Sequence, residues 1–202
     1  MTHVNDDAQF LGKYESSGRI GRWLIDRFFQ AGRELLEPRI RPGANILEVG
    51  CGPGYSTQRI ARWKPEANLI ATDLSSSLLR KAANLNPGIP FTQESVLGLA
   101  HGDKTFDCVI MLEVLEHLED PQAALLELQR VTNDYLLLST PREPVWRMLN
   151  CVRGKYLGNF GNTPGHIQHW STKQLIKEVA TCFHVEAKAT PVPWTILLLR
   201  PK

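Results

Sequence analysis

ILEVGCGPGYST, residues Ile46–Thr57, runs from four strand-forming residues into three glycines at every second position. A short aliphatic strand that leads into a glycine-rich turn is typical of a doubly wound α/β sheet, in which ligands bind beyond the carboxyl ends of the strands. Glycine lets the backbone turn tightly and approach a ligand closely. Pro53 removes one amide donor, and Tyr55 stands where a dinucleotide fingerprint has its last glycine. The turn therefore favours a ligand other than a pyrophosphate.

Strand-like and helix-like stretches alternate along the rest of the chain, which favours an α/β fold. Pro38 is expected to end the leading helix, and Ser75 to cap the third. The last two strands are joined by a short proline-rich turn and are expected to pair antiparallel at one sheet edge. We expect helices over 20–36, 55–63, 76–84, 121–131 and 173–181, and strands over 45–49, 68–72, 89–94, 106–111, 134–140, 183–188 and 194–200.

Length and composition favour one domain over residues 1–202, because 202 residues that are 43% hydrophobic bury one good core. The net charge of +2 is too small for an obligate nucleic-acid binder, so we expect no nucleic-acid partner. The four cysteines form no Cys-x-x-Cys pair, and the first ten residues lack the features of a signal peptide. The longest apolar run is also far too short to span a bilayer. We expect a cytoplasmic protein.

Asp73 follows the second predicted strand, where an acidic residue can accept both hydroxyl groups of a ribose. Asp is also a good helix cap, and the following residues DLSSSLL could simply start the next helix. The sequence leaves both roles open, and they are compatible with one another.

Three ordered motifs resemble the class I S-adenosylmethionine-dependent methyltransferases, of the methyltransferase type 11 or ubiquinone-pathway O-methyltransferase group. ILEVGCGPG resembles their first motif, ATDLSSSLLRKA their second, and FDCVIMLEVLEHLEDPQAALLELQRV their fourth strand with the next helix. The resemblance covers about residues 45–140. It implies a Rossmann-like seven-stranded sheet with an antiparallel last strand, helices on both faces, and S-adenosyl-L-methionine as cofactor.

The resemblance also implies which residues hold the methyl donor. The third motif departs from the family type, because Ser95 stands where many relatives carry Asp, with Glu94 beside it. The residues expected at the donor are Glu48, Gly50, Cys51, Gly52, Gly54, Asp73, Leu74, Ser95, Val96 and Met111.

Methyl transfer from a sulfonium needs alignment, an acceptor whose proton is removed, and exclusion of water. The candidates for taking the proton are Glu116 and His117, just past the fourth strand, and His166 and His169 farther along the chain. The alternative is structural, because a Glu-His pair at this turn can hold a helix and a loop together, and a lone His is more often structural than catalytic.

No metal is expected in the leading interpretation. The alternative is a magnesium-class ion on Glu113, Glu116, His117 and His166, because metal-using relatives hold such an ion with a similar Glu-x-x-Glu-His trio and a later histidine. Residues three and four apart meet on one face of a helical turn, and carboxylates supply hard oxygen ligands.

Residues 141–170 form a long connection rich in Gly, Pro, Arg and aromatic residues. Such a segment in a compact domain is usually functional or disordered. Three alternatives stand for residues 144–155: a lid over the acceptor pocket, a helix on a membrane surface, or a helix packed on the core. We favour the lid. Similarity to the ubiquinone-pathway O-methyltransferases implies a substrate-side insertion with peripheral membrane contact.

The sequence therefore predicts an enzyme that methylates a small-molecule acceptor, with a hydroxyl group of a hydrophobic or lipid-like metabolite as the acceptor. One alternative is an RNA 3′-terminal ribose methyltransferase, which shares a similar Glu-x-x-Glu-His and a later His near an aromatic residue. The near-neutral charge counts against it. The other alternative is a module that binds the donor but is inactive.

Overall fold

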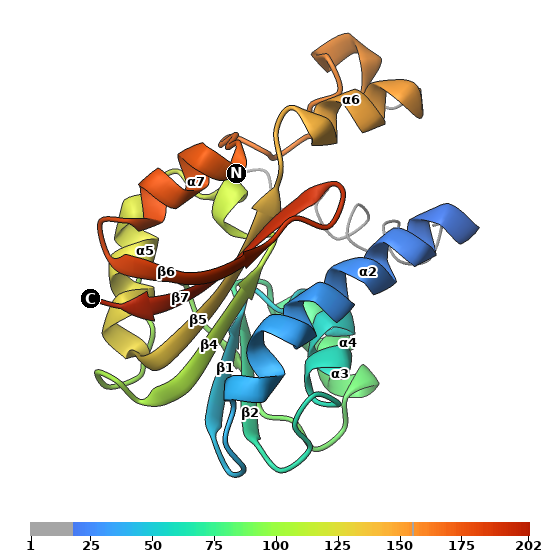
Figure 1. The fold of residues 1–202 in the computed structure, drawn as a ribbon. Coiled ribbons are helices and arrows are strands. Elements are labelled where there is room, and N and C mark those ends of the chain that lie inside the picture. The colour runs from blue at the N-terminus through green and yellow to red at the C-terminus, as the bar shows by residue number, and fades with distance from the viewer. Residues whose placement is uncertain (1–17, 155) are drawn as a thin grey trace.

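The computed structural model describes residues 18–154 and 156–202. They form a seven-stranded sheet in the order β3-β2-β1-β4-β5-β7-β6, with helices on both faces (Figure 1). Strand β7 runs antiparallel to both of its neighbours, whereas the pairs from β3 to β5 are parallel. The predicted doubly wound sheet with an antiparallel last strand is confirmed.

The strands are β1 (Asn45–Val49), β2 (Asn68–Asp73), β3 (Phe91–Gln93), β4 (Phe106–Leu112), β5 (Thr132–Pro141), β6 (Phe183–Ala189) and β7 (Trp194–Pro201). The helices are α2 (Arg19–Leu36), α3 (Tyr55–Ile60), α4 (Ser76–Leu85), α5 (Pro121–Val131), α6 (Val145–Val152) and α7 (Thr172–Val179). Short 3-10 turns are η1 (Glu37–Arg39), η2 (Leu115–His117) and η3 (Leu157–Asn159).

Alternate residues of the central strands supply two separate layers of core. Leu47, Val109 and Leu136 pack with α5 and α7 on one face, because successive side chains of a strand point to opposite faces. Their neighbours Ile46, Cys108 and Leu137 pack with α2 on the other face. The near-continuous apolar runs in the sequence thus reflect strands that are buried on both faces.

Several helix boundaries differ from the predicted ones for local reasons. The helix predicted to reach Trp63 ends at Ile60, because the chain then tightens into i→i−3 bonds from Arg62 to Arg59 and from Trp63 to Ile60. Helix α7 begins one residue early, at Thr172, because Ser171 and Gln174 form a capping box. Ser75 caps α4 as predicted, accepting a bond from the Leu78 amide.

The pairing of β5 with β7 brings the start of β7 to the carboxyl edge of the sheet. Pro141 pairs with Trp194, so the first residue of β7 lies beside the last residue of β5. Helix α6 follows β5 directly and stands apart from the layered body at this same edge (Figure 1). The residues after β1, β4 and β5 can therefore build one site.

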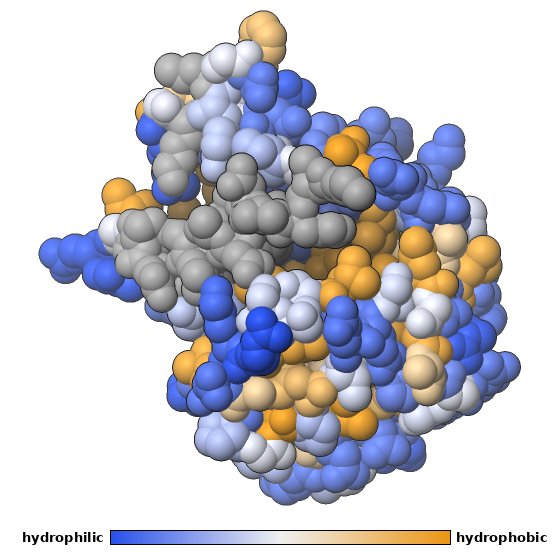
Figure 2. All heavy atoms as spheres, turned by 180° about the vertical axis from the view of Figure 1, so that it is seen from behind, coloured by the Kyte–Doolittle hydropathy of each residue, from blue (hydrophilic) through white to orange (hydrophobic). Residues whose placement is uncertain are grey.

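Polar and apolar side chains are mixed on the rear face of the molecule, where apolar residues gather in separate patches among polar ones (Figure 2). None of the helices in the described part of the chain combines the length and apolar character of a membrane span. The first ten residues, which lack signal-peptide features in the sequence, lie outside the described residues, as does Lys155 at the end of the predicted lid.

Candidate functional site

The glycine turn after β1 has the conformation that its sequence requires. Gly50 and Gly54 have φ values of 74° and 86°, which side-chain-bearing residues rarely adopt. A Cβ at Gly50 would lie 2.4 Å from Val114, and one at Gly54 would lie 2.8 Å from the Ala82 backbone. The turn is therefore fixed by close packing against the segment after β4 and against α4.

Asp73 ties the glycine turn to the start of α4. Its two carboxylate oxygens accept hydrogen bonds from the backbone amides of Gly52 and Ser75, each at 2.8 Å. The N-cap of α4 is Ser75 itself, so Asp73 supports the helix start without capping it. Its carboxylate lies at the carboxyl end of β2, where the donor's ribose is expected.

Glu48 lies underneath the glycine turn and outside the pocket lining. Its side chain is 1% exposed and accepts a hydrogen bond from the Thr57 hydroxyl at 2.5 Å. Burial raises the pKa of the Glu48 carboxyl to about 7, and the negative charge of Asp73 adds to the rise, against the lowering effect of hydrogen bonds from Ser56 and Thr57. Glu48 therefore joins β1 to the first turn of α3 and supports the turn from below.

Met111 does not face the ligand side, which corrects the sequence-based expectation. It is fully buried in the core on the α5 and α7 face of the sheet. The next residue, Leu112, lines the pocket instead, because side chains alternate along a strand. Val96, also expected at the donor, is 7% exposed and belongs to the same core as Met111.

Leu74 and Ser95 follow β2 and β3 at the same edge of the sheet as Asp73. Leu74 is 58% exposed, and the Ser95 hydroxyl accepts a hydrogen bond from the Leu97 amide. Both positions lie outside the lining of the pocket described below. They can contact only the part of a donor that extends beyond this pocket.

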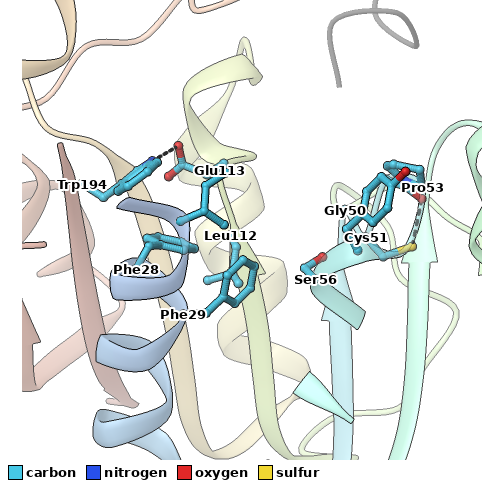
Figure 3. A pocket seen from close by; sticks show the side chains of 12 residues that line it. Phe28, Phe29, Gly50, Cys51, Pro53, Ser56, Leu112, Glu113 and Trp194 are labelled. Atoms are coloured by element: carbon cyan, nitrogen blue, oxygen red, sulfur yellow. Dashed lines mark hydrogen bonds between the residues drawn. The ribbon is translucent and has the colours of Figure 1, made fainter. Parts of the chain in front are cut away.

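One pocket at this edge brings the glycine turn opposite a wall of aromatic side chains (Figure 3). Burial raises the pKa of the Cys51 thiol in this pocket, so it is no thiolate nucleophile near neutral pH. The pocket is lined by Ile25, Phe28, Phe29, Gly50, Cys51, Gly52, Pro53, Tyr55, Ser56, Leu112, Glu113 and Trp194. Its apolar half is therefore built by α2, the end of β4 and the start of β7.

Sequence reasoning missed the residues that α2 and β7 contribute to this pocket. Ile25, Phe28 and Phe29 stand at helical spacing, and such spacing does not distinguish a core face from the wall of a ligand pocket. Trp194 contacts Phe28, with ring centroids 4.9 Å apart. The two residues are far apart in the sequence, so a local sequence pattern cannot predict this contact.

Glu116, His117 and His166 lie close together in the structure. They belong both to the residues expected to take the proton and to the residues expected to hold an ion. One ligand atom from each of the three side chains lies within 4.8 Å of the others. The His117 and His166 rings meet edge to face with centroids 4.9 Å apart. Glu116 and His166 are buried, whereas His117 is partly exposed.

Backbone contacts explain why His166 reaches this cluster. The carbonyl oxygen of Glu116 accepts hydrogen bonds from the amides of Ile167 and Gln168, each at 3.0 Å. The His117 ring nitrogen Nδ1 lies 2.9 Å from the carbonyl oxygen of Gly165. The segment around His166 is thereby docked on η2, so the predicted Glu-His pair does hold a turn and a loop together.

His169 and Glu113 lie apart from this cluster. The His169 Nε2 atom is hydrogen-bonded to the Asn162 side chain at 2.7 Å, and burial together with the charge of Arg147 lowers the pKa of its imidazole. Glu113 was expected on the same helical turn as Glu116, but it precedes η2 and has a φ of 59°. Its carboxylate is hydrogen-bonded by Ser139 and Trp194.

Helix α6 has a buried anchor and an exposed apolar side. Trp146 is 8% exposed and packs its ring against those of Trp194 and His166, at centroid distances of 5.9 and 5.8 Å. Met148 and Val152 are 64% and 84% exposed. Trp146 is therefore packed against the body of the protein, as the third alternative for this segment expects. The opposite side of the helix is available for contact with a ligand or a surface.

The fold is that of the Rossmann-like methyltransferases, as comparison with solved structures shows. Magnesium protoporphyrin IX methyltransferase from Synechocystis PCC 6803, solved with bound S-adenosylhomocysteine, is similar with a TM-score of 0.71 and 19% sequence identity, over 98% of this chain and 94% of that chain. The PH0226 protein from Pyrococcus horikoshii OT3 is similar with a TM-score of 0.68 and 16% identity, over 95% of each chain.

Sequence comparison adds the family. The family described as "Methyltransferase domain" matches residues 47–135, from β1 into β5. The mitochondrial ubiquinone biosynthesis O-methyltransferase of Schizosaccharomyces pombe is 34% identical over 147 residues, which is 69% of this chain and 54% of that protein. An uncharacterised methyltransferase of the same yeast is 40% identical over 99 residues, or 43% of this chain and 35% of that protein.

The stretch from β1 into β5 matches the methyltransferase domain family, as the three ordered motifs indicated, and the comparisons support S-adenosylmethionine as the cofactor. The chain spans between about a third and a half of the length of the two yeast relatives.

Proposed function

We propose that the protein transfers a methyl group from S-adenosylmethionine to a hydroxyl group of a hydrophobic or lipid-like small molecule. The observation that carries this proposal is the pocket in which the glycine turn faces the apolar wall of Phe28, Phe29 and Trp194. The glycine turn is suited to the donor, and the aromatic wall to an apolar acceptor. Such a pocket aligns the two reactants and excludes water.

The proposed base is His117, with Glu116 and His166 as its supporting neighbours. A carbonyl oxygen only accepts hydrogen bonds, so the contact with Gly165 assigns the proton of the neutral His117 ring to Nδ1. Nε2 is then the nitrogen that can take the acceptor's proton. A nearby carboxylate favours the imidazolium that results, and Glu116 belongs to the same cluster.

A row of rings links the pocket to this cluster. It runs from Trp194 through Trp146 to His166 and His117, with successive centroids 5.9, 5.8 and 4.9 Å apart. We propose that the acceptor lies along this row, with its apolar part against the tryptophans and its hydroxyl group toward His117. His169, which is bonded to Asn162, has no part in this step.

Residues 144–155 are proposed to form a lid at the acceptor entrance, with peripheral membrane contact as a second role. Trp146 fixes one side of α6, while Met148 and Val152 expose an apolar side. Arg147 and Arg153 flank this side, and such a pattern suits a lipid or an interface with anionic lipid. The S. pombe relative named for ubiquinone biosynthesis is in keeping with a hydrophobic acceptor.

A bound divalent ion is a second candidate for the chemistry at the histidine cluster. Glu116, His117 and His166 offer one oxygen and two nitrogen ligands, a mixed set that suits a borderline ion such as zinc better than magnesium. Such an ion would lower the pKa of the acceptor's hydroxyl group. Glu113, the fourth residue expected from sequence, is bonded to Ser139 and Trp194 instead.

Cytoplasmic localisation is part of the proposal, since all four cysteines, three of them buried, are free thiols.

The test of function is transfer of a labelled methyl group. The protein is incubated with methyl-labelled S-adenosylmethionine and with polar metabolites, prenylated phenols or short RNA in separate reactions. Label in the prenylated phenols supports the proposal. Label in RNA alone would establish the nucleic-acid alternative, and donor binding without any product would establish the inactive module.

A further inference from the structure

Glu113 occupies a strained position at the wall of the pocket. It follows β4 directly and has a φ of 59°, in the left-handed region that side-chain-bearing residues rarely adopt. Such a conformation persists only where the surroundings determine it, and it is most often found at functional sites. Glycine would adopt this backbone without strain, so a glutamate here points to a use for its carboxylate.

Two neighbouring strands hold that carboxylate in place. The hydroxyl group of Ser139, a fully buried residue of β5, donates a hydrogen bond to Oε1 at 3.0 Å, and its oxygen also lies 3.2 Å from the Glu113 amide. The indole Nε1 of Trp194, from β7, donates to Oε2 at 2.7 Å (Figure 3). Ser139 and Trp194 are neutral donors, so these two bonds orient the carboxylate and do not themselves neutralise it.

The surroundings of the carboxylate suit a cation. Glu113 lines the pocket together with Leu112, Phe28 and Trp194, and the glycine turn forms the other side (Figure 3). A negative charge acts more strongly next to apolar side chains than in water. The faces of aromatic rings also attract cations.

We propose that Glu113, held by Ser139 and Trp194, determines specificity for the methylated donor by recognising its positively charged sulfonium. This inference rests on the proposed function, because the donor must bind in this pocket. When the methyl group moves to the acceptor oxygen, the carbon–sulfur bond breaks and the sulfur keeps the electron pair, leaving a neutral thioether. The attraction to Glu113 is then lost, so the pocket prefers S-adenosylmethionine over the spent S-adenosylhomocysteine.

The test compares three ligands by isothermal titration calorimetry on the wild-type chain and on Glu113→Gln. S-adenosylmethionine and sinefungin, an analogue with an ammonium group in place of the methylsulfonium, are cationic at the reacting centre, whereas S-adenosylhomocysteine is neutral there. We expect Glu113→Gln to raise the Kd of both cationic ligands about tenfold and that of S-adenosylhomocysteine less than about twofold. Equal weakening of all three would assign the carboxylate to the ammonium group that they share and overturn the proposal. Unchanged affinities would also overturn it.

Two further variants separate charge recognition from folding. Glu113→Gly relieves the left-handed backbone, so it should keep the thermal stability of the wild type and still lose the preference for the cationic ligands. Trp194→Phe keeps a ring but removes the indole donor, and it should lose part of the same preference. A Trp194→Phe protein with the full wild-type preference would contradict the positioning role of Trp194.

The matched control is Glu127→Gln, a carboxylate on α5 that is bonded to Arg130 and the Leu99 amide away from the pocket. It should bind all three ligands like the wild type. A wild-type chain that binds none of the three ligands would count against the proposed function. The role of Glu113, which rests on donor binding in this pocket, would then fail with it.

Discussion

The carboxylate of Asp73 and the backbone amide of Gly52 are joined by a hydrogen bond of 2.8 Å. The residue expected to receive the donor's ribose thus also fixes the turn expected to approach the donor. The second carboxylate oxygen of Asp73 holds the Ser75 amide, so one side chain connects β2, the glycine turn and the start of α4.

Replacing Asp73 by alanine should therefore affect both the donor and the turn. We expect Asp73→Ala to weaken S-adenosylhomocysteine binding by about 1–3 kcal/mol, because hydrogen bonds to a charged group are lost. Calorimetry measures this loss, and the ligand should raise the Tm of the variant less than that of the wild type. Asp134→Ala, at the opposite end of the sheet, is the control. Wild-type affinity in Asp73→Ala would restrict Asp73 to a structural role.

Glu48 should make stability depend on pH. Its pKa is raised from an ordinary value of 4.5 to about 7 in the folded protein. Below pH 4.5 the Glu48 carboxyl group is protonated in both the folded and the unfolded chain, so it does not reduce the free energy of unfolding. As the pH rises toward 7, the unfolded chain loses the proton while the folded protein keeps it, so stability falls, and above pH 7 the loss is constant at roughly 3 kcal/mol.

Glu48→Gln should remove this dependence. We expect the difference in unfolding free energy between the variant and the wild type to move in favour of the variant from pH 5 to pH 8, in urea titrations at each pH. A difference that stays constant over this range would show that Glu48 does not titrate there. Glu186→Gln, on the exposed strand β6, is the control.

The two sides of α6 should respond differently to substitution. Trp146→Ala removes a buried ring that packs on Trp194, so we expect a loss of about 3 kcal/mol in unfolding free energy with donor affinity unchanged. Val152→Ser acts on an 84% exposed side chain and should change stability by less than about 0.5 kcal/mol. It should reduce turnover of hydrophobic acceptors or binding to anionic vesicles. Normal turnover and vesicle binding in Val152→Ser would leave α6 without the proposed role.

His117 should be needed for the transfer step but not for donor binding. With His117 as the base, His117→Ala should lower kcat by at least about 100-fold at unchanged donor Kd, and activity should survive exhaustive chelation. His184→Ala, on β6 and away from the site, is the control. Activity that is lost in chelator and restored by manganese or zinc, together with parallel losses in His117→Ala and His166→Ala, would establish the metal alternative.

Local patterns predicted the parts of the site that lie next to one another in sequence. The glycine turn and Asp73 were predictable because strand, turn and acidic residue occur in a fixed order over a short distance. Met111 was misplaced because successive side chains of a strand point to opposite faces, so Met111 lies in the core while its neighbour Leu112 lines the pocket. Glu113 was grouped with Glu116 on an assumed helix, but its left-handed backbone turns it toward Trp194.

The long-range parts of the site could not be derived from local patterns, and the grouping of His166 with Glu116 and His117 was expected only from the resemblance to metal-using relatives. His166 reaches His117 only because the amides after it bond to the carbonyl oxygen of Glu116. Trp194 reaches Phe28 through the antiparallel placement of β7, which motifs imply in outline but do not place residue by residue.

The contact between Phe28 and Trp194 has a consequence for biosynthesis. Translation completes the glycine turn and its support by Asp73 long before it reaches β7, so a nascent chain can hold a donor turn that still lacks the aromatic wall. The aromatic wall of the pocket therefore forms only after β7 has been synthesised and has paired with β5.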